Sequence, residues 1–292
     1  GRACVERPAV TEKLARATSC PLTAVVSPAG FGKTTAVVSW LRTLKDVPCA
    51  WYLLDAEDAA LDRFWLYLVT ALRRADERIC QSFDDVRLPD EFSKLRPALD
   101  ALIIQMTEYG RDFVCVLEDF HEVHEDAGIH ESVHYLLKHL PPNAHFVVTS
   151  RQALRFPIAK MRVEGALNEV GEADLRLSVD EAGALLDEMA EEFPPEFYDE
   201  LNGGIALLPE AKEDPEGEHG ELYIMGEYCN DMMGKYINLY YGSFAALAGQ
   251  EDWTEEDWED ELYTTLAHEF THHIEGRAGE RGLERKDEQF ME

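Results

Sequence analysis

The chain has 292 residues, 46% of them hydrophobic and 10% aromatic, which is enough for two globular domains, each with its own core. No apolar run approaches the roughly 18 to 20 residues that a bilayer-crossing helix needs, so we expect a soluble protein with no membrane partner. The net charge of -31 is unevenly distributed. Residues 1 to 174 hold 20 Lys and Arg against 26 Asp and Glu, and residues 175 to 292 hold 7 against 32. Such an acidic second part repels phosphate backbones, so we expect no direct binding of nucleic acid by this chain.

The cysteines favour a cytoplasmic, reducing location. The chain has six of them, with no CxxC spacing, and several stand in apolar segments such as FVCVLED, where a reduced thiol packs as a small hydrophobic group. This usage also argues against a zinc site made of thiolates. The cysteines are Cys4, Cys20, Cys49, Cys80, Cys115 and Cys229.

The first predicted elements are a strand, a loop and a helix. Residues 22 to 27, LTAVVS, are apolar and β-branched, SPAGFGKTT follows, and AVVSWLRTL has a helical pattern. A phosphate-binding loop requires this order, because glycines let backbone amides face an anion, a lysine neutralises the β and γ phosphates, and a hydroxyl reaches Mg²⁺. Ser27 stands where the first glycine of the usual pattern would be. The candidate nucleotide-binding residues are Gly30, Gly32, Lys33, Thr34 and Thr35.

A second, acidic strand is predicted at residues 113 to 120, FVCVLEDF, which ends in Glu118 and Asp119. In a phosphate-binding protein one such carboxylate holds Mg²⁺, directly or through water, and the other polarises the attacking water. The alternative is that both only cap a buried strand. A third buried strand, HFVVTSR at 145 to 151, puts Arg151 at its carboxyl end, where ligands bind in parallel sheets.

Residues 7 to about 185 resemble the nucleotide-binding domain of the large ATP-binding LuxR-type transcription regulators, the maltose-activator group of signal-transducing ATPases. The resemblance implies ATP binding with Mg²⁺ and slow hydrolysis used as a switch. It implies roles for Lys33 and Thr34 in the phosphate loop, for Glu118 and Asp119 in the acidic strand, and for Arg151 as a sensor. Glu118 stands where the family more often has aspartate. The matching stretches are RPAVTEKL, SPAGFGKTT, AWYLLDAEDAALDRFWLYLVTAL, VLEDFHEV, HFVVTSR and LRLSVDEAGALL.

From about residue 176 the sequence predicts a small α+β unit. Two helices are expected, SVDEAGALLDEMAEE and PPEFYDELN, followed by strands at GIALLP, LYIMGEY and YINLYYGSF and a long helix from about 255 to 275. We therefore expect an α/β P-loop NTPase domain, a parallel sheet flanked by helices, at residues 1–175, and a minimal zincin-like α+β domain at 176–292.

The last predicted helix carries the pattern HEFTH. His268 and His272 are four residues apart, so both rings project from one face and can bind one zinc ion. Glu269 is then placed to take a proton from zinc-bound water and pass it to a leaving amine. Chance occurrence and a surface histidine cluster that includes His273 are the alternatives. The stripe Leu262, Leu266, Phe270 and Ile274 favours a helix embedded beside such a site.

Zinc requires a third protein ligand, which spacing alone does not identify. Glu275 lies three residues past His272, but its distance from His268 along the helix makes shared tetrahedral coordination awkward. Glu275 could instead form a salt bridge or contact one of the zinc ligands without binding the ion itself. The remaining candidates are Glu280, Asp287 and Glu288.

Residues 176 to 292 also resemble the small bacterial zincin-like metallopeptidases. In compact members of that family the third ligand is an acidic residue soon after the second histidine, which implies the Asp287 and Glu288 pair here, with Asp287 preferred. The matching stretches are EEFPPEFYDELNGGIALLPEA, ELYIMGEY, YINLYYGSF and TLAHEFTHHIEGRAGERGLERKDEQF.

Two functions are compatible with these patterns. The first is zinc-dependent hydrolysis of peptides or unfolded proteins by the second domain, fused to an ATP-binding domain. The alternative is a nucleotide-dependent regulatory module without a DNA-binding region, in which the zincin-like part is a non-catalytic appendage.

Overall fold

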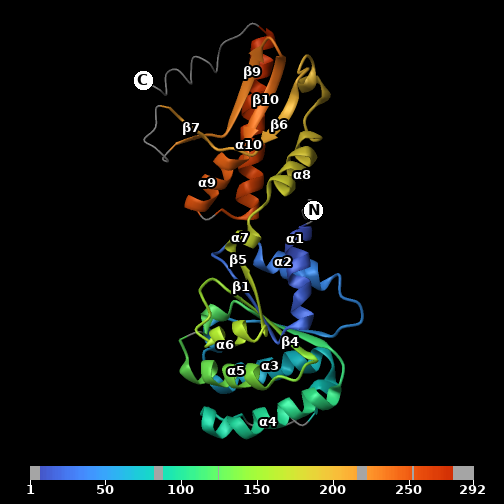
Figure 1. Cartoon of the computed structure of the whole chain (residues 1–292), viewed down its shortest axis with the longest axis vertical. Helices are drawn as coiled ribbons and strands as arrows, with labels where there is room; N and C mark the ends of the chain where they lie inside the picture. The colour runs from blue at the N-terminus through green and yellow to red at the C-terminus, as the bar shows by residue number, and fades with distance from the viewer. Residues whose placement is uncertain (1–6, 82–87, 124, 216–221, 252, 279–292) are drawn as a thin grey trace. The chain divides into compact units, whose positions relative to one another are not determined.

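A computed structural model describes residues 7–81, 88–123, 125–215, 222–251 and 253–278 (Figure 1). The chain divides into two compact units, Arg7–Arg176 and a second one that begins at Leu177. Each unit has a hydrophobic core of its own.

The first unit is built on a five-stranded parallel sheet with the order β2-β3-β4-β1-β5. Strands β3 and β4 are buried along their whole length, as expected for central strands covered by helices on both faces. The strands are β1 (Leu22–Val26), β2 (Cys49–Leu53), β3 (Phe113–Glu118), β4 (Ala144–Ser150) and β5 (Leu167–Gly171).

Helices cover both faces of this sheet because successive strand residues point to opposite sides. On β3, Val114 and Val116 pack with α1 and α2, whereas Phe113, Cys115 and Leu117 pack in the larger cluster with α3, α4 and α5. Figure 1 shows these last three helices grouped together in the first unit. The helices are α1 (Pro8–Ala15), α2 (Lys33–Leu41), α3 (Leu61–Ala75), α4 (Phe92–Tyr109), α5 (Ala127–His139), α6 (Ile158–Val163) and α7 (Glu172–Leu175).

The strand order brings three chain segments together at one edge of the sheet. The partner of Val26 on β1 is Ser150 on β4, and the Ser27 amide donates to the Ser150 carbonyl at 3.3 Å. Strand β3 lies on the other side of β4. The loop after β1, the acidic end of β3 and the end of β4 are therefore neighbours at the carboxyl edge, where ligands bind in parallel sheets.

The second unit contains a three-stranded sheet with the order β6-β10-β9, in which β10 pairs in parallel with β6 and antiparallel with β9. A short antiparallel pair, β7 and β8, lies outside it. The strands are β6 (Gly204–Leu208), β7 (Lys212–Glu213), β8 (Tyr223–Ile224), β9 (Gly226–Asp231) and β10 (Gly234–Tyr240).

Helices α8 (Val179–Ala190), α9 (Tyr241–Glu251) and α10 (Glu255–Ala278) complete the second unit. Ser178 caps α8 in a capping box with Glu181, which satisfies backbone donors at the helix start. On α10, Leu262, Leu266 and Phe270 are fully buried and form one core cluster with the inward-facing residues of β10. Three residues of the expected apolar stripe therefore hold α10 to the sheet, whereas Ile274 is only half-buried.

Residues 194 to 202 do not form the expected helix. They make only a short 3₁₀ turn at Pro195–Tyr198. Asp199 then has an extended backbone and Glu200 has a φ of 65°, in the left-handed region, so helical hydrogen bonding cannot continue.

The strand expected at 236 to 244 ends at Tyr240, and helix α9 begins at the next residue. The last residue of β10 that pairs with β6 is Tyr240, opposite Leu208, and the last that pairs with β9 is Leu239, opposite Gly226. Beyond Tyr240 the backbone has no strand partners, and a helix satisfies its hydrogen-bonding groups instead.

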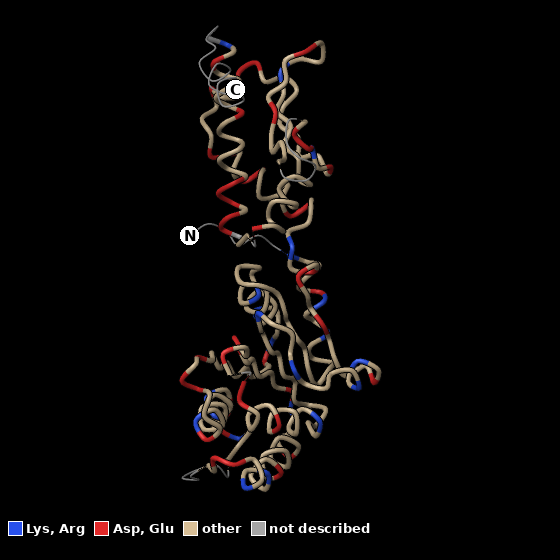
Figure 2. The backbone as a smooth tube through the Cα atoms, turned by 90° about the vertical axis from the view of Figure 1, so that its left-hand side faces the viewer, with Lys and Arg blue, Asp and Glu red and all other residues tan. Residues whose placement is uncertain are grey.

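Acidic residues dominate the second unit, as the charge count indicates (Figure 2). Several stand near the start of α10, and Glu256 and Asp257 lie in its first turn, where negative charge interacts favourably with the helix dipole. Among the described residues no helix is long and apolar enough to span a membrane.

Candidate functional site

The loop between β1 and α2 has the backbone of a phosphate-binding loop. Gly30 and Gly32 have φ values of 85° and 69°, in the left-handed region that favours glycine. Helix α2 begins directly afterwards at Lys33, so its first amides face the inside of the loop. Thr34 and Thr35 lie in the first turn of the same helix.

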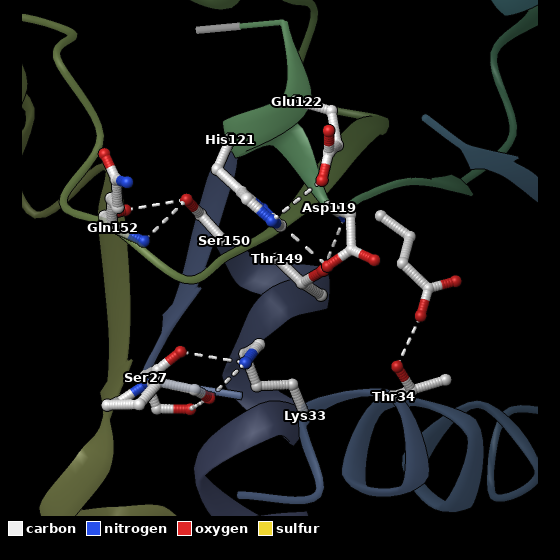
Figure 3. A network of polar contacts seen from close by, with 11 residues as sticks. Ser27, Lys33, Thr34, Asp119, His121, Glu122, Thr149, Ser150 and Gln152 are labelled. Carbon is white, nitrogen blue, oxygen red and sulfur yellow. Dashed lines mark hydrogen bonds and ion pairs between the residues drawn. The ribbon is translucent and has the colours of Figure 1, made fainter. Parts of the chain in front are cut away.

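The Lys33 side chain lies over this loop and is only 8% exposed. Its Nζ donates to the carbonyl of Ser27 at 2.8 Å and to that of Pro28 at 2.6 Å (Figure 3). Burial lowers the pKa of Lys33, while the nearby Asp119 raises it. The ammonium is thus held beside the loop, where it can neutralise an anion.

The carboxylate of Glu118 lies at the end of β3 and is held from two sides. The Thr34 hydroxyl donates to Oε1, and the indole N–H of Trp51 on β2 donates to Oε2 at 2.8 Å. Glu118 is 7% exposed. The structure therefore brings together the hydroxyl and the carboxylate that the sequence suggested as Mg²⁺ ligands.

Asp119 follows in a left-handed conformation, with φ 57° and ψ 45°. Aspartate tolerates this region better than most residues with a Cβ atom, because its short side chain can hydrogen-bond locally. The Asp119 amide donates to Thr149 Oγ1 on β4 at 3.0 Å, which fixes the turn (Figure 3). The side chains of Glu118 and Asp119 consequently do not share one direction, and they can take different roles.

His121 belongs to the same site, although the sequence patterns gave it no role. Its Nδ1 lies 3.8 Å from Asp119 Oδ1 and its Nε2 lies 3.3 Å from Glu122 Oε1. Burial lowers the pKa of His121, and the two carboxylates oppose this effect. The only signal in the sequence was its place two residues after the acidic pair, in VLEDFHEV.

Arg151 follows β4 and is exposed. It lies close enough to contribute electrostatically to Lys33 and to His121, and it lowers the pKa of both. The guanidinium is therefore a second positive group at the same edge of the sheet, which suits binding of an anion.

The second candidate site lies on α10. His268 Nε2 and His272 Nε2 are 3.0 Å apart. Two nitrogens bound to one tetrahedral zinc ion are about 3.3 Å apart, from Zn–N bonds of about 2.0–2.1 Å, so the two rings can converge on one ion. Glu269 is 6% exposed and lines the same cavity as both histidines.

This cavity measures about 910 Å³ and is also bordered by β8 and β9. Strand β9 approaches α10 very closely here. A Cβ atom on Gly226 would lie 2.8 Å from Thr265 Cγ2 and 3.0 Å from Glu269 Cγ. A larger residue at position 226 would therefore displace side chains at this crossing, including that of Glu269.

His273 does not belong to the histidine pair. It is fully buried and its Nε2 lies 2.9 Å from the Asp199 carbonyl oxygen, whereas His268 is exposed. The three histidines therefore do not form one surface cluster.

No third zinc ligand is identified. Within the described part of the chain, no group of three or more His, Cys, Asp or Glu side chains is arranged to hold a metal ion. Glu275 lines the cavity. Glu280, Asp287 and Glu288 lie outside the described residues.

The chain is similar to curated transcription regulators. It is 33% identical over 177 residues to the HTH-type transcriptional regulator MalT of Vibrio cholerae. The aligned residues cover 61% of this chain and 19% of that relative. MalT of Vibrio campbellii is 34% identical over 177 residues, which are again 61% of this chain and 19% of that relative. The match thus spans about a fifth of the length of these relatives.

Solved structures of low similarity also match. The Walker-type ATPase of Pyrococcus abyssi is 14% identical, with a TM-score of 0.40, over 68% of this chain and 64% of that one. A signal-transduction ATPase with numerous domains and a tetratricopeptide repeat sensor, from Pyrococcus horikoshii, is 15% identical, with a TM-score of 0.41. That match covers 70% of this chain and 28% of the other. No protein-family model matches the chain.

The N-terminal region therefore resembles the MalT-like regulators, as its motifs indicated, and it has the parallel sheet and phosphate loop of a P-loop NTPase. The resemblance of residues 176–292 to zincin-like peptidases stays a prediction, because none of the comparisons supports it.

Proposed function

We propose that the first unit binds ATP with Mg²⁺ and works as a nucleotide-dependent regulatory module. The observation that carries this proposal is the meeting of Lys33, Thr34 and Glu118 at the carboxyl edge of the sheet, beside a loop with two left-handed glycines. The similarity to MalT, which is named as a transcriptional regulator, supports the regulatory part.

The position of each residue indicates a separate role. The loop amides and Lys33 would bind the phosphates, and Thr34 with Glu118 would hold the Mg²⁺ ion, which neutralises phosphate charge when it is bound. Asp119 is turned away from Glu118 and is the candidate for polarising the attacking water. Arg151 would respond to the terminal phosphate.

The magnesium assignment predicts a selective defect in Thr34→Val. This nearly isosteric change removes the hydroxyl, so the strengthening of ATP binding by Mg²⁺ should fall about tenfold, the typical effect of losing one hydrogen bond to a charged group. ATP affinity in EDTA should stay within about twofold. Isothermal titration of both proteins, with Mg²⁺ and with EDTA, measures this.

Thr107→Val is the matched control, because Thr107 is an exposed helical threonine on α4 whose hydroxyl donates only to the Ile103 carbonyl. It should bind ATP as the unmodified protein does. An equal loss of affinity in Mg²⁺ and EDTA for Thr34→Val would contradict the assignment of Thr34 to the metal.

A second candidate function is zinc-dependent peptide hydrolysis by the second unit. It is favoured by the convergence of His268 and His272 above a cavity that Glu269 also lines. Zinc would be held by the two imidazoles and one carboxylate, Asp287 by the family resemblance, and when bound it would acidify a water molecule. Glu269 would then accept the proton.

This candidate predicts the zinc content of the protein. Elemental analysis after exhaustive desalting should give close to one zinc per chain, and His272→Ala should reduce it to near zero, because two histidines and one carboxylate leave no spare ligand. His139→Ala is the control, since His139 lies on α5 in the other unit. Equal zinc in all three proteins would rule out the α10 site.

A further inference from the structure

Trp51 contacts the acidic strand in a way that the sequence motifs did not predict. Its indole N–H donates to Glu118 Oε2 at 2.8 Å, while Oε1 accepts from Thr34. The carboxylate is thus held between β2 and α2, with one oxygen for each partner.

The sheet register creates this contact. Trp51 on β2 is opposite Val116 on β3, and Glu118 is two residues further along the same strand. Residues two apart on a strand share a face, so Trp51 and Glu118 are diagonal neighbours on the face covered by α2. Cys49, Trp51, Val114 and Val116 all pack in the core cluster of that face.

The extra methylene of Glu118 gives its carboxylate more rotamers than an aspartate has, so it needs a partner to stay in one position. The indole supplies such a partner and cannot itself accept a proton or bind a metal, because it is a donor only. It leaves the second lone pairs of the carboxylate available to a cation or to its water shell.

We propose that Trp51 is a positioning residue that fixes the Glu118 carboxylate for Mg²⁺. This inference rests on the proposed function of the first unit and adds to it the group that orients the metal ligand. It also makes the emission of Trp51 sensitive to events at the carboxylate, because the indole N–H is bonded directly to it.

The test compares ATP affinity in Mg²⁺ and in EDTA for the unmodified protein, Trp51→Phe, Glu118→Gln and the double variant, by isothermal titration. In Trp51→Phe the ratio of the two dissociation constants should fall about tenfold, because Mg²⁺ binding must then order a Glu118 side chain that the indole no longer holds, with affinity in EDTA within about twofold. In the Glu118→Gln background, Trp51→Phe should cause no further fall.

Three results would overturn the inference while leaving ATP binding established. The ratio could be unchanged in Trp51→Phe, or ATP affinity could fall equally in EDTA and in Mg²⁺. The ratio could also fall as much when Trp51→Phe is added to Glu118→Gln. If the unmodified protein binds ATP no better than Lys33→Ala does, the proposed function is refuted, and the inference with it.

A fluorescence measurement requires no substitution at position 51. Adding Mg²⁺ to the ATP complex should change the tryptophan emission of the unmodified protein but not that of Glu118→Gln. Trp40 and Trp65 are each no more than 1% exposed and neither donates to Glu118, so they should contribute little to the change. The same response in both proteins would overturn the inference.

Discussion

Lys33→Ala is expected to weaken ATP binding at least about 100-fold, because hydrogen bonds between charged groups contribute ~1.5–3 kcal/mol each and the ammonium can reach more than one phosphate. The loss should be larger than this term alone suggests, since the Lys33 charge would no longer offset the nearby carboxylates of Glu118 and Asp119. Isothermal titration with ATP in Mg²⁺ measures the affinity.

Lys45→Ala is the matched control for this substitution, because Lys45 is exposed in the segment after α2. Its ATP affinity should equal that of the unmodified protein within about twofold. Thermal unfolding without nucleotide checks that Lys33→Ala is folded. Comparable ATP binding by the two variants would mean that the loop does not bind phosphate through Lys33.

Gly242→Ala should destabilise the second unit by roughly 3 kcal/mol, the upper part of the range for overpacking, because the obstacle is backbone. A Cβ atom on Gly242 would lie 2.3 Å from the Ala211 nitrogen and 2.6 Å from the Glu210 carbonyl carbon. The Gly242 amide also donates to the Glu210 carbonyl at 3.2 Å. The start of α9 and the backbone of Glu210 and Ala211 are therefore held together, and moving them apart to make room for a Cβ atom would break this hydrogen bond.

Urea unfolding followed by tryptophan fluorescence measures this effect, since Trp253 and Trp258 are both buried in the second unit. Gly183→Ala is the matched control: Gly183 lies inside α8, and a Cβ atom there would meet nothing within 4 Å. That variant should gain about 0.5–1 kcal/mol from the higher helix propensity of alanine. A Gly242→Ala protein as stable as the control would disprove the close contact.

The two units call for separate experiments because their candidate chemistries depend on different residues. The nucleotide site rests on Lys33, Thr34 and Glu118, all within Arg7–Arg176, whereas the histidine pair lies on α10. Loss of zinc in His272→Ala should leave ATP affinity unchanged, and loss of ATP binding in Lys33→Ala should leave zinc content unchanged. Each function is therefore tested with the other as an internal control.

The sequence by itself determined the features that depend on short segments. The glycines and lysine of SPAGFGKTT lie between a strand and a helix, the acidic pair ends a buried strand, and the apolar stripe of α10 is buried up to Phe270. Backbone conformation and side-chain periodicity encode such features within a few residues. The same patterns could not identify a third zinc ligand, which spacing along the chain does not determine.

Only the tertiary structure decided which distant residues complete the site. Trp51 reaches Glu118 because β2 pairs with β3, and Thr149 holds the Asp119 amide because β4 lies beside β3. It also decided that the chain turns from strand to helix after Tyr240, where the neighbouring strands no longer offer partners. Strand pairing joins residues far apart in sequence, and no local pattern records which strand will be the neighbour.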